Sequence, residues 1–186
     1  YRQYRLAVKN LVTGEVSALP AEKTGSVAWA ADNRTLFYTV EDEAKRQYRL
    51  YRHQVGTNEH TLIYEERDEA FAVGVLRSRS RDFLFLTLGS LTTSEWRYLP
   101  AAEPRGEWRT LEPRRHDIEY SVEQEGGTFW IAINDAGRNF RLVVAPVATP
   151  GQENWREVTP VRPEVMIEGI DAFARWLVRY ERENGP

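Results

Sequence analysis

Apolar residues recur along this chain with a period of about 46 residues. Runs of strand-forming residues begin at Leu36, Phe83, Phe129 and Trp176, at intervals of 46 or 47 residues. A period of roughly 40 to 50 residues with several short strands in each repeat is typical of β-propeller blades. One blade cannot bury both of its faces, so the pattern predicts blades that stack on their neighbours.

Each repeat contains four short apolar segments separated by polar turns. The turn at Ala31–Arg34 has residues that tolerate tight backbone geometry, and Gly126-Gly127 accepts positive φ angles. The predicted strands, from the propeller axis outward in each of three repeats, are Ser26–Ala30, Thr35–Val40, Tyr48–Gln54 and Thr61–Glu65; Ala72–Leu76, Asp82–Thr87, Ser94–Leu99 and Trp108–Leu111; and Glu119–Glu123, Thr128–Asn134, Phe140–Ala145 and Trp155–Val158.

The two ends of the chain are predicted to be half blades. Tyr4–Lys9 and Glu15–Leu19 match the outer two strands of a blade, and Val165–Ile170 and Trp176–Glu181 match the inner two. We therefore expect an all-β fold, a propeller fragment with these divisions: a half blade over residues 1–20, blades over 21–66, 67–112 and 113–160, and a half blade over 161–186.

The arc of blades is expected to stay open. Closing it into four blades would turn each blade by about 90° instead of the roughly 50° of a seven-bladed ring. Backbone pairing between Leu6–Val8 and Leu177–Arg179 would contradict this expectation. Large aromatic residues suit the space between blades, so the recurring tryptophans are predicted to pack there rather than to stack on a ligand. These are Trp29, Trp96, Trp130, Trp155 and Trp176.

Composition narrows the function classes. The 186 residues carry a net charge of −3, which gives no electrostatic reason to expect a nucleic-acid partner. No apolar run approaches the roughly 18 residues of a membrane span, and no signal peptide is visible. Cysteine is absent, which excludes disulfides and thiolate chemistry and favours a cytoplasmic location. The start at Tyr1 rather than Met suggests a piece of a longer chain.

Motifs for chemistry are sparse. The Gly-x-Ser-x-Gly turn of serine hydrolases is absent, and His53, His60 and His116 lack the spacing of metal ligands. We predict no metal, no cofactor and no catalytic residue here. The run Arg77–Arg81 has the composition of an anion site, but it occupies the position of a turn, so solvated turn residues are the favoured interpretation.

Several uncommon strings make the chain resemble the propeller of oligopeptidase B, in the prolyl-oligopeptidase family of serine peptidases. The resemblance covers nearly the whole chain. The strings are Tyr4-Arg5-Leu6, Asn10–Glu15, Val27–Asn33, Arg77–Arg81, Thr92–Glu95, Glu119–Glu123, Asn139–Leu142, Asn154–Val158 and Glu181–Gly185.

The resemblance implies a seven-bladed propeller that caps an α/β-hydrolase catalytic domain, in an enzyme that cleaves short peptides after Lys or Arg. It implies that the triad and the acidic specificity pocket lie in that other domain, so no family catalytic residue is carried onto this chain. The expected role of this segment is to gate substrate access by size. Its expected partners are short basic peptides and the catalytic domain.

The first strand of each blade would line the central channel. On that basis Glu119 and Glu123 are candidate channel residues that favour basic peptides, and the alternative is that they are ordinary solvent-facing strand residues. Two other functions remain open at this point: a stand-alone scaffold propeller that binds protein partners, and an extracellular sugar-binding propeller. The chain lacks the Trp-Asp dipeptide common in scaffold propellers.

Overall fold

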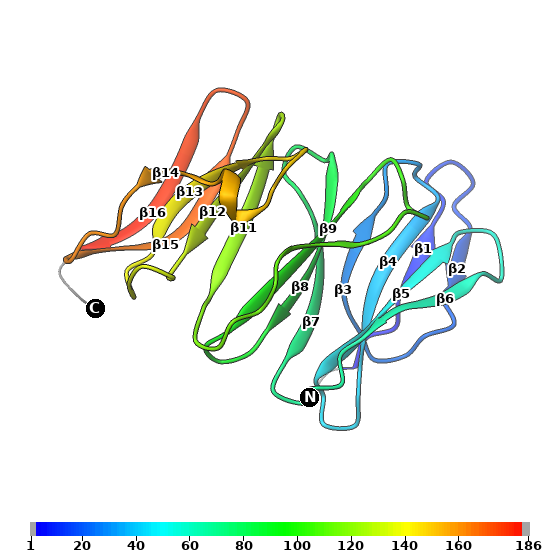
Figure 1. Ribbon diagram of the computed structural model, residues 1–186. Coiled ribbons are helices and arrows are strands. Elements are labelled where there is room, and N and C mark those ends of the chain that lie inside the picture. The colour runs from blue at the N-terminus through cyan, green and yellow to red at the C-terminus, as the bar shows by residue number, and fades with distance from the viewer. Residues whose placement is uncertain (1–2, 184–186) are drawn as a thin grey trace.

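A computed structural model describes residues 3–183, over which the chain forms sixteen β-strands and one short 3₁₀ turn, Gln152–Asn154. The strands make three four-stranded antiparallel sheets and two two-stranded sheets, which follow one another in chain order (Figure 1). This confirms the all-β prediction. Within the same residues no helix has the length and apolar character that crossing a membrane requires.

Each four-stranded sheet is a simple meander in which consecutive strands pair. The first two-stranded sheet is β1 (Ala7–Lys9) and β2 (Val16–Ala18), and the last is β15 (Val165–Ala172) and β16 (Leu177–Glu183). The four-stranded sheets are β3 (Thr24–Trp29), β4 (Thr35–Glu41), β5 (Gln47–Gln54) and β6 (His60–Glu65); β7 (Ala72–Arg77), β8 (Phe83–Gly89), β9 (Ser94–Pro100) and β10 (Arg109–Glu112); and β11 (Tyr120–Glu125), β12 (Thr128–Ile133), β13 (Arg141–Pro146) and β14 (Arg156–Thr159).

The sixteen predicted strands are all present, and the differences lie at their ends. The outer strands β10 and β14 each sit one residue later than predicted, beside β-bulges that shift their pairing with β9 and β13. The inner strand β15 runs two residues further than predicted, to Ala172. Residues 1–2 and 184–186 of the two predicted half blades lie outside the described residues.

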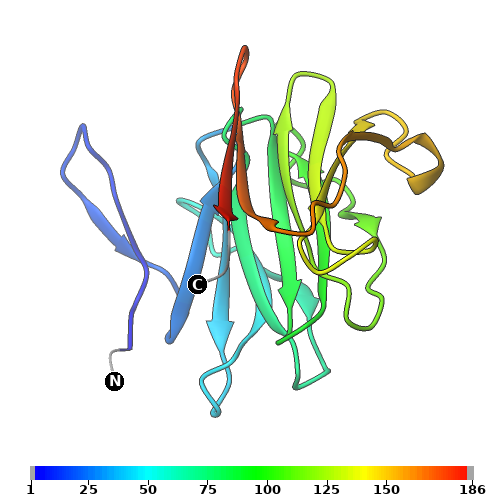
Figure 2. The same cartoon turned by 90° about the vertical axis from the view of Figure 1, so that its left-hand side faces the viewer.

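The arc is open. Within residues 3–183, β1 pairs only with β2 and β16 pairs only with β15, so no backbone pairing joins the two end sheets. Figure 1 shows them at opposite ends of the row of sheets, and Figure 2 shows the β1–β2 hairpin standing apart at one side. The expectation of an open arc is confirmed.

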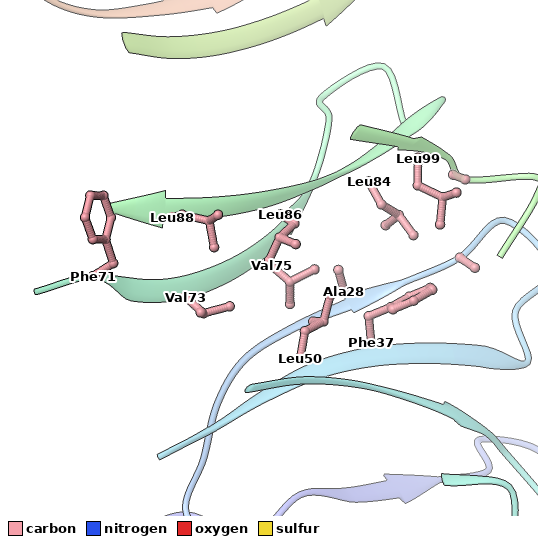
Figure 3. Close-up of a cluster of buried hydrophobic side chains, with 12 residues drawn as sticks. Ala28, Phe37, Leu50, Phe71, Val73, Val75, Leu84, Leu86, Leu88 and Leu99 are labelled. Carbon is pink, nitrogen blue, oxygen red and sulfur yellow. The ribbon is translucent and has the colours of Figure 1, made fainter. Parts of the chain in front are cut away.

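The hydrophobic core lies between the sheets rather than within any one of them. The first large cluster joins Phe37 and Leu50 of one sheet to Val75, Leu86 and Leu99 of the next (Figure 3). Strand residues alternate between the two faces of a sheet, so each four-stranded sheet presents apolar side chains on both faces. Each sheet is therefore stabilised by the neighbours that cover it.

The same arrangement repeats along the arc. Phe85 and Tyr98 pack with Phe129 and Ile131 across the next interface, where the rings of Tyr98 and Phe129 meet edge to face at 5.0 Å. A smaller cluster joins β12 and β13 to Ile167 and Ile170 of β15, and another joins Leu19 to β4.

The tryptophan prediction is wrong for two of the five residues. Trp29 is exposed at the end of β3, and the Trp176 side chain, just before β16, is 76% exposed. Trp96, Trp130 and Trp155 are partly buried against the inter-sheet clusters, as predicted. The fully buried rings are instead Phe37, Phe85 and Phe129, together with Tyr38, because the second strand of each blade is covered on both sides.

A comparison of two leucines shows how much stability comes from burial between sheets rather than from the residue type. Leu86 is 1% exposed in the first cluster, whereas Leu91 is 92% exposed in the loop that follows β8. We expect Leu86→Ala to lower the free energy of unfolding in urea by about 2 to 5 kcal/mol. The matched substitution Leu91→Ala should change the free energy of unfolding by less than about 0.5 kcal/mol. Equal losses at both positions would contradict the core described above.

Candidate functional site

The four inner strands, β3, β7, β11 and β15, each begin a sheet, and each turns sharply into the second strand. β3 packs on β7, and β11 packs on β15. Side chains from the turn after β7 reach the ends of β11 and β15, so these turns gather at one end of the inner strands. The opposite end carries the segments that enter each sheet from the one before.

Glu119 lies immediately before β11, and Glu123 lies within that strand. They are four positions apart, or about 13 Å along an extended chain. Both are half-buried. Glu119 lines a pocket of about 400 Å³ together with Phe140, Met166 and Glu168. The two predicted channel residues therefore belong to one inner segment but not to one site.

Glu123 belongs to a group of five residues that we call the inner-turn cluster: Arg79, Glu123, Asp171, Phe173 and Tyr180. Arg79 donates to one oxygen of the Asp171 carboxylate, and the Tyr180 hydroxyl donates to the other at 2.8 Å. The Arg79 guanidinium also lies 5.0 Å from the centre of the Phe173 ring. The cluster thus joins three sheets, with Arg79 spanning from the sheet of β7 to that of β15.

The pKa values of the two carboxylates in the inner-turn cluster are shifted in opposite directions. The hydrogen bond from Tyr180, and then that from Arg79, lower the pKa of Asp171. Burial raises the pKa of Glu123; Arg79 opposes that rise and Asp171 adds to it. Oε2 of Glu123 is buried and has no hydrogen-bond partner among the described residues. Buried acceptors are usually satisfied, so this oxygen is a candidate contact for a ligand.

The arginine run predicted to be a turn does lie on the turn between β7 and β8, but its residues are not simply solvated. Arg77 donates twice to the Arg81 carbonyl oxygen, at 2.9 and 2.7 Å, and Ser78 is buried. Arg81 has a positive φ of 69°, which the carbonyl contact helps to hold. Arg79, the middle arginine of the run, is paired with Asp171.

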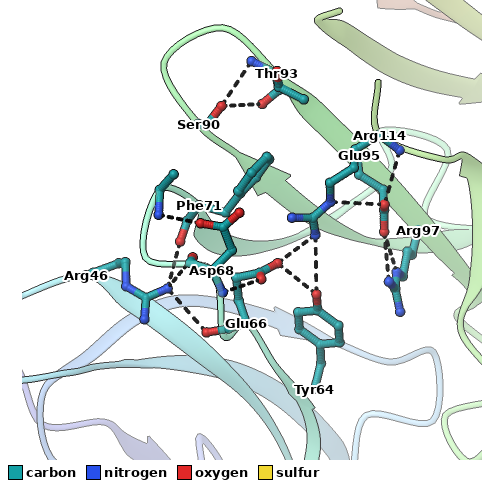
Figure 4. Close-up of polar contacts among 11 residues, drawn as sticks. Arg46, Tyr64, Glu66, Asp68, Phe71, Ser90, Thr93, Glu95, Arg97 and Arg114 are labelled. Atoms are coloured by element: carbon teal, nitrogen blue, oxygen red, sulfur yellow. Dashed lines mark hydrogen bonds and ion pairs between the residues drawn. The ribbon is translucent and has the colours of Figure 1, made fainter. Parts of the chain in front are cut away.

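A second polar group, on the opposite end of the inner strands, was not predicted from the sequence. Arg114, between β10 and β11, binds Glu66 at 2.6 Å and Glu95 at 3.3 Å, and its guanidinium lies 4.0 Å from the centre of the Phe71 ring (Figure 4). Tyr64 also donates to Glu66 at 2.8 Å. These contacts join the sheets that contain β6 and β9 to the segment that leads into β11. Only the tertiary contacts distinguish Arg114 from the other 21 arginines.

Two of the three histidines, His53 and His60, are cross-strand partners on β5 and β6, and His116 lies in the loop before β11. His53 is buried and contacts the Glu59 carbonyl oxygen at 2.8 Å, His60 contacts the Tyr38 hydroxyl at 2.7 Å, and His116 is exposed. Burial raises the pKa of Tyr38 to about 12. In the part of the chain that the structure describes, no group of three or more His, Asp or Glu side chains is arranged to hold a metal ion.

The comparison with known families agrees with this architecture. The family described as the prolyl oligopeptidase N-terminal β-propeller domain matches residues 1–186, the whole chain. The chain belongs to this family. The sheets of four strands described above are thus blades of a prolyl-oligopeptidase propeller, and the predicted resemblance to oligopeptidase B is confirmed at the level of the family.

Individual relatives are peptidases. Dipeptidyl aminopeptidase BI of Pseudoxanthomonas mexicana is 37% identical over 98% of this chain and 26% of its own length. Protease 2 of Moraxella lacunata is 30% identical over 90% of this chain and 26% of its own. The solved structure of oligopeptidase B from Trypanosoma brucei, with covalently bound antipain in its closed form, has a TM-score of 0.81 and 28% identity over 88% of this chain and 24% of that one. The chain spans about a quarter of the length of the relatives it matches.

Arg114 gives a stability prediction for the propeller. Arg114→Ala would leave the carboxylates of Glu66 and Glu95 buried without their cation, and we expect the free energy of unfolding at neutral pH to fall by about 2 to 3 kcal/mol. The control Arg67→Ala removes an exposed arginine 3.8 Å from Glu65 and should change it by less than about 0.5 kcal/mol. A loss at Arg114 no larger than the loss at Arg67 would show that the contacts do not stabilise the fold.

The ion pair between Arg114 and Glu66 also predicts that the stability of the propeller depends on pH. Burial alone would raise the pKa of Glu66, but hydrogen bonds from Arg114, the Asp68 amide and Tyr64 lower it below its usual range. Its stabilising contribution is therefore present above the unfolded pKa and lost as the pH falls through the folded one. In Arg114→Ala burial dominates, so the stability gap between parent and variant should narrow from neutral pH to about pH 4. A constant gap in urea titrations would contradict this.

Proposed function

We propose that this chain is the substrate-admitting propeller of a serine oligopeptidase that resembles oligopeptidase B and hydrolyses short peptides after Lys or Arg. The observation that carries the proposal is that the family match covers all 186 residues and that this chain is built entirely as stacked blades. In the proposed enzyme the catalytic triad lies in an α/β-hydrolase domain outside this chain. A cytoplasmic location stays a prediction.

The names of the relatives support a peptidase. They include a dipeptidyl aminopeptidase, a protease, and an oligopeptidase B to which antipain is covalently bound. These names imply different peptide substrates. The preference for Lys or Arg is therefore part of the proposal. The proposed partners are short basic peptides and the catalytic domain.

The physical basis of the proposed gating is the rigidity of the blade interfaces. Inter-sheet clusters of fully buried side chains cannot deform without opening cavities. A passage bounded by such blades has a fixed width. A folded domain of 100 residues has a radius of gyration of about 13 Å and cannot enter a passage sized for a single extended chain. Short peptides can enter, so selection by size follows from packing.

We propose further that Glu119 and Glu123 favour basic peptides on this passage. Glu119 lies just before β11 and Glu123 lies within it, so a basic peptide running along β11 would meet the two carboxylates in succession. Glu168 adds a third carboxylate beside Glu119. Carboxylates attract cations in their vicinity, most strongly at low ionic strength.

The size limit is tested on the full-length protein that contains this chain. A nested series of peptides would carry the same cleavable Arg bond within progressively longer sequences, and the longest member would also be presented inside a stable folded domain. We expect kcat/KM to be high for the short peptides and to fall at least a hundredfold for the folded presentation. Equal rates on the unfolded long peptide and the folded domain would contradict gating by size.

Charge reversal tests the two carboxylates. In the full-length protein, Glu119→Lys combined with Glu123→Lys should lower the ratio of kcat/KM on basic over neutral-flanked peptides by about tenfold, equivalent to about 1.4 kcal/mol. The control variant, Glu153→Lys with Glu157→Lys, makes the same change in net charge on the outer edge of the same blade. An unchanged ratio in the inner-strand variant, or an equal fall in the control, would remove the assignment.

A further inference from the structure

The position of Arg79 is unusual for a side chain on an exposed turn. It crosses from the turn after β7 to Asp171 on β15, although the sheet of β11 stands between those two sheets in chain order. The contact joins residues 92 positions apart in the sequence. Arg79 therefore passes beside the inner strand β11, where Glu123 lies.

The surroundings of the Arg79 guanidinium are those of a site that recognises a basic side chain. One carboxylate binds it directly, a second carboxylate interacts with it through charge, and the Phe173 ring lies beside it. Planar guanidinium groups bind carboxylates with directed N–H bonds and also stack on aromatic rings. The Tyr180 hydroxyl holds the second oxygen of Asp171 and so fixes the orientation of that carboxylate.

The site offers one acceptor more than Arg79 uses. Oε2 of Glu123 is buried and has no hydrogen-bond partner among the described residues, although Arg79 is close enough to influence its charge. A guanidinium that entered from a different direction could donate to Asp171 and to this oxygen together. Arg79 therefore satisfies the Asp171 carboxylate but leaves the Glu123 oxygen without a hydrogen bond.

Arg79 is more exposed than Arg114. The Arg79 side chain is 46% exposed, whereas Arg114, at the other end of the inner strands, is 27% exposed between two buried carboxylates. An ion pair of such exposure contributes little to stability and is weakened by salt. When Arg79 swings into solvent, the space it occupied opens to solvent on the same side.

We propose that the inner-turn cluster is a binding subsite for an arginine or lysine side chain of a peptide, and that Arg79 is an internal occupant that the peptide displaces. Asp171 and Glu123 accept the hydrogen bonds of the incoming cation, and Phe173 covers its apolar or planar part. The subsite rests on the proposed function only for the origin of the peptide, because binding requires no hydrolysis.

The test measures binding, not activity. The full-length protein would be titrated by calorimetry with Nα-acetyl-arginine amide, and with the matching citrulline compound, which has the same shape without the charge. Removing an internal competitor raises the apparent affinity by the inverse of the fraction of sites that were free of the competitor, so a tenfold gain corresponds to about one free site in ten. We therefore expect Arg79→Ala to bind the arginine compound at least tenfold more tightly than the parent. The citrulline compound should show no gain.

A second substitution, added to Arg79→Ala, shows whether the gain in affinity depends on the inner-turn cluster. Adding Asp171→Asn to Arg79→Ala should remove at least tenfold of the affinity, and adding Glu123→Gln should remove about threefold or more. Arg175→Ala is the control, because Arg175 is an exposed arginine on the neighbouring turn after β15, and it should bind like the parent. Arg79→Gln, which keeps most of the side-chain length, repeats the experiment if Arg79→Ala folds poorly.

Three outcomes would overturn the subsite. Affinity could fail to rise in both Arg79 variants, the gain could survive Asp171→Asn, or Arg79→Ala could lower the free energy of unfolding with no change in probe binding, which would make Arg79 a structural tie. Any binding by a catalytic domain is the same in all variants, so it is fitted as a second site with shared parameters and only the remaining site is compared. Loss of peptide hydrolysis with these differences intact would refute the proposed function and leave the subsite standing.

Discussion

The fold depends on burial of sheet faces between neighbouring blades. Phe37, Phe85 and Phe129 lie on the second strands of successive sheets, and each is fully buried between sheets. No blade is stable by its own contacts alone, because its apolar faces are covered only when the next sheet is present. The repeat in the sequence and the arc in space are therefore two expressions of one constraint.

Arginine ion pairs connect the blades at both ends of the inner strands, with different consequences. Arg114, on the segment between β10 and β11, is enclosed between Glu66 and Glu95 and lies on the Phe71 ring, so it ties two neighbouring sheets to the segment that leads into the third. Arg79 connects the turn after β7 to β15 through one exposed ion pair. The first contact suits a permanent structural role, and the second is the one proposed to exchange with a ligand.

The functional assignment follows from where the polar groups lie relative to this frame. In the described residues Glu66 is paired with Arg114, which lies beyond the next sheet, whereas Glu123 is left with an unsatisfied oxygen. The proposed peptidase chemistry lies outside this chain, which spans about a quarter of the length of its relatives. The proposed contribution of the propeller is to select peptides by width and by charge.

The sequence by itself determined the all-β architecture, the sixteen strands and the open arc, because a period of 46 residues and alternating apolar positions are local properties that survive without knowledge of contacts. It could not decide which aromatic residues are buried, as Trp29 and Trp176 show, since burial depends on what covers a face. Nor could it separate Glu119 from Glu123 or single out Arg79 and Arg114 among many arginines. Those distinctions arise only when residues as many as 92 positions apart are brought together, and that is decided by tertiary structure.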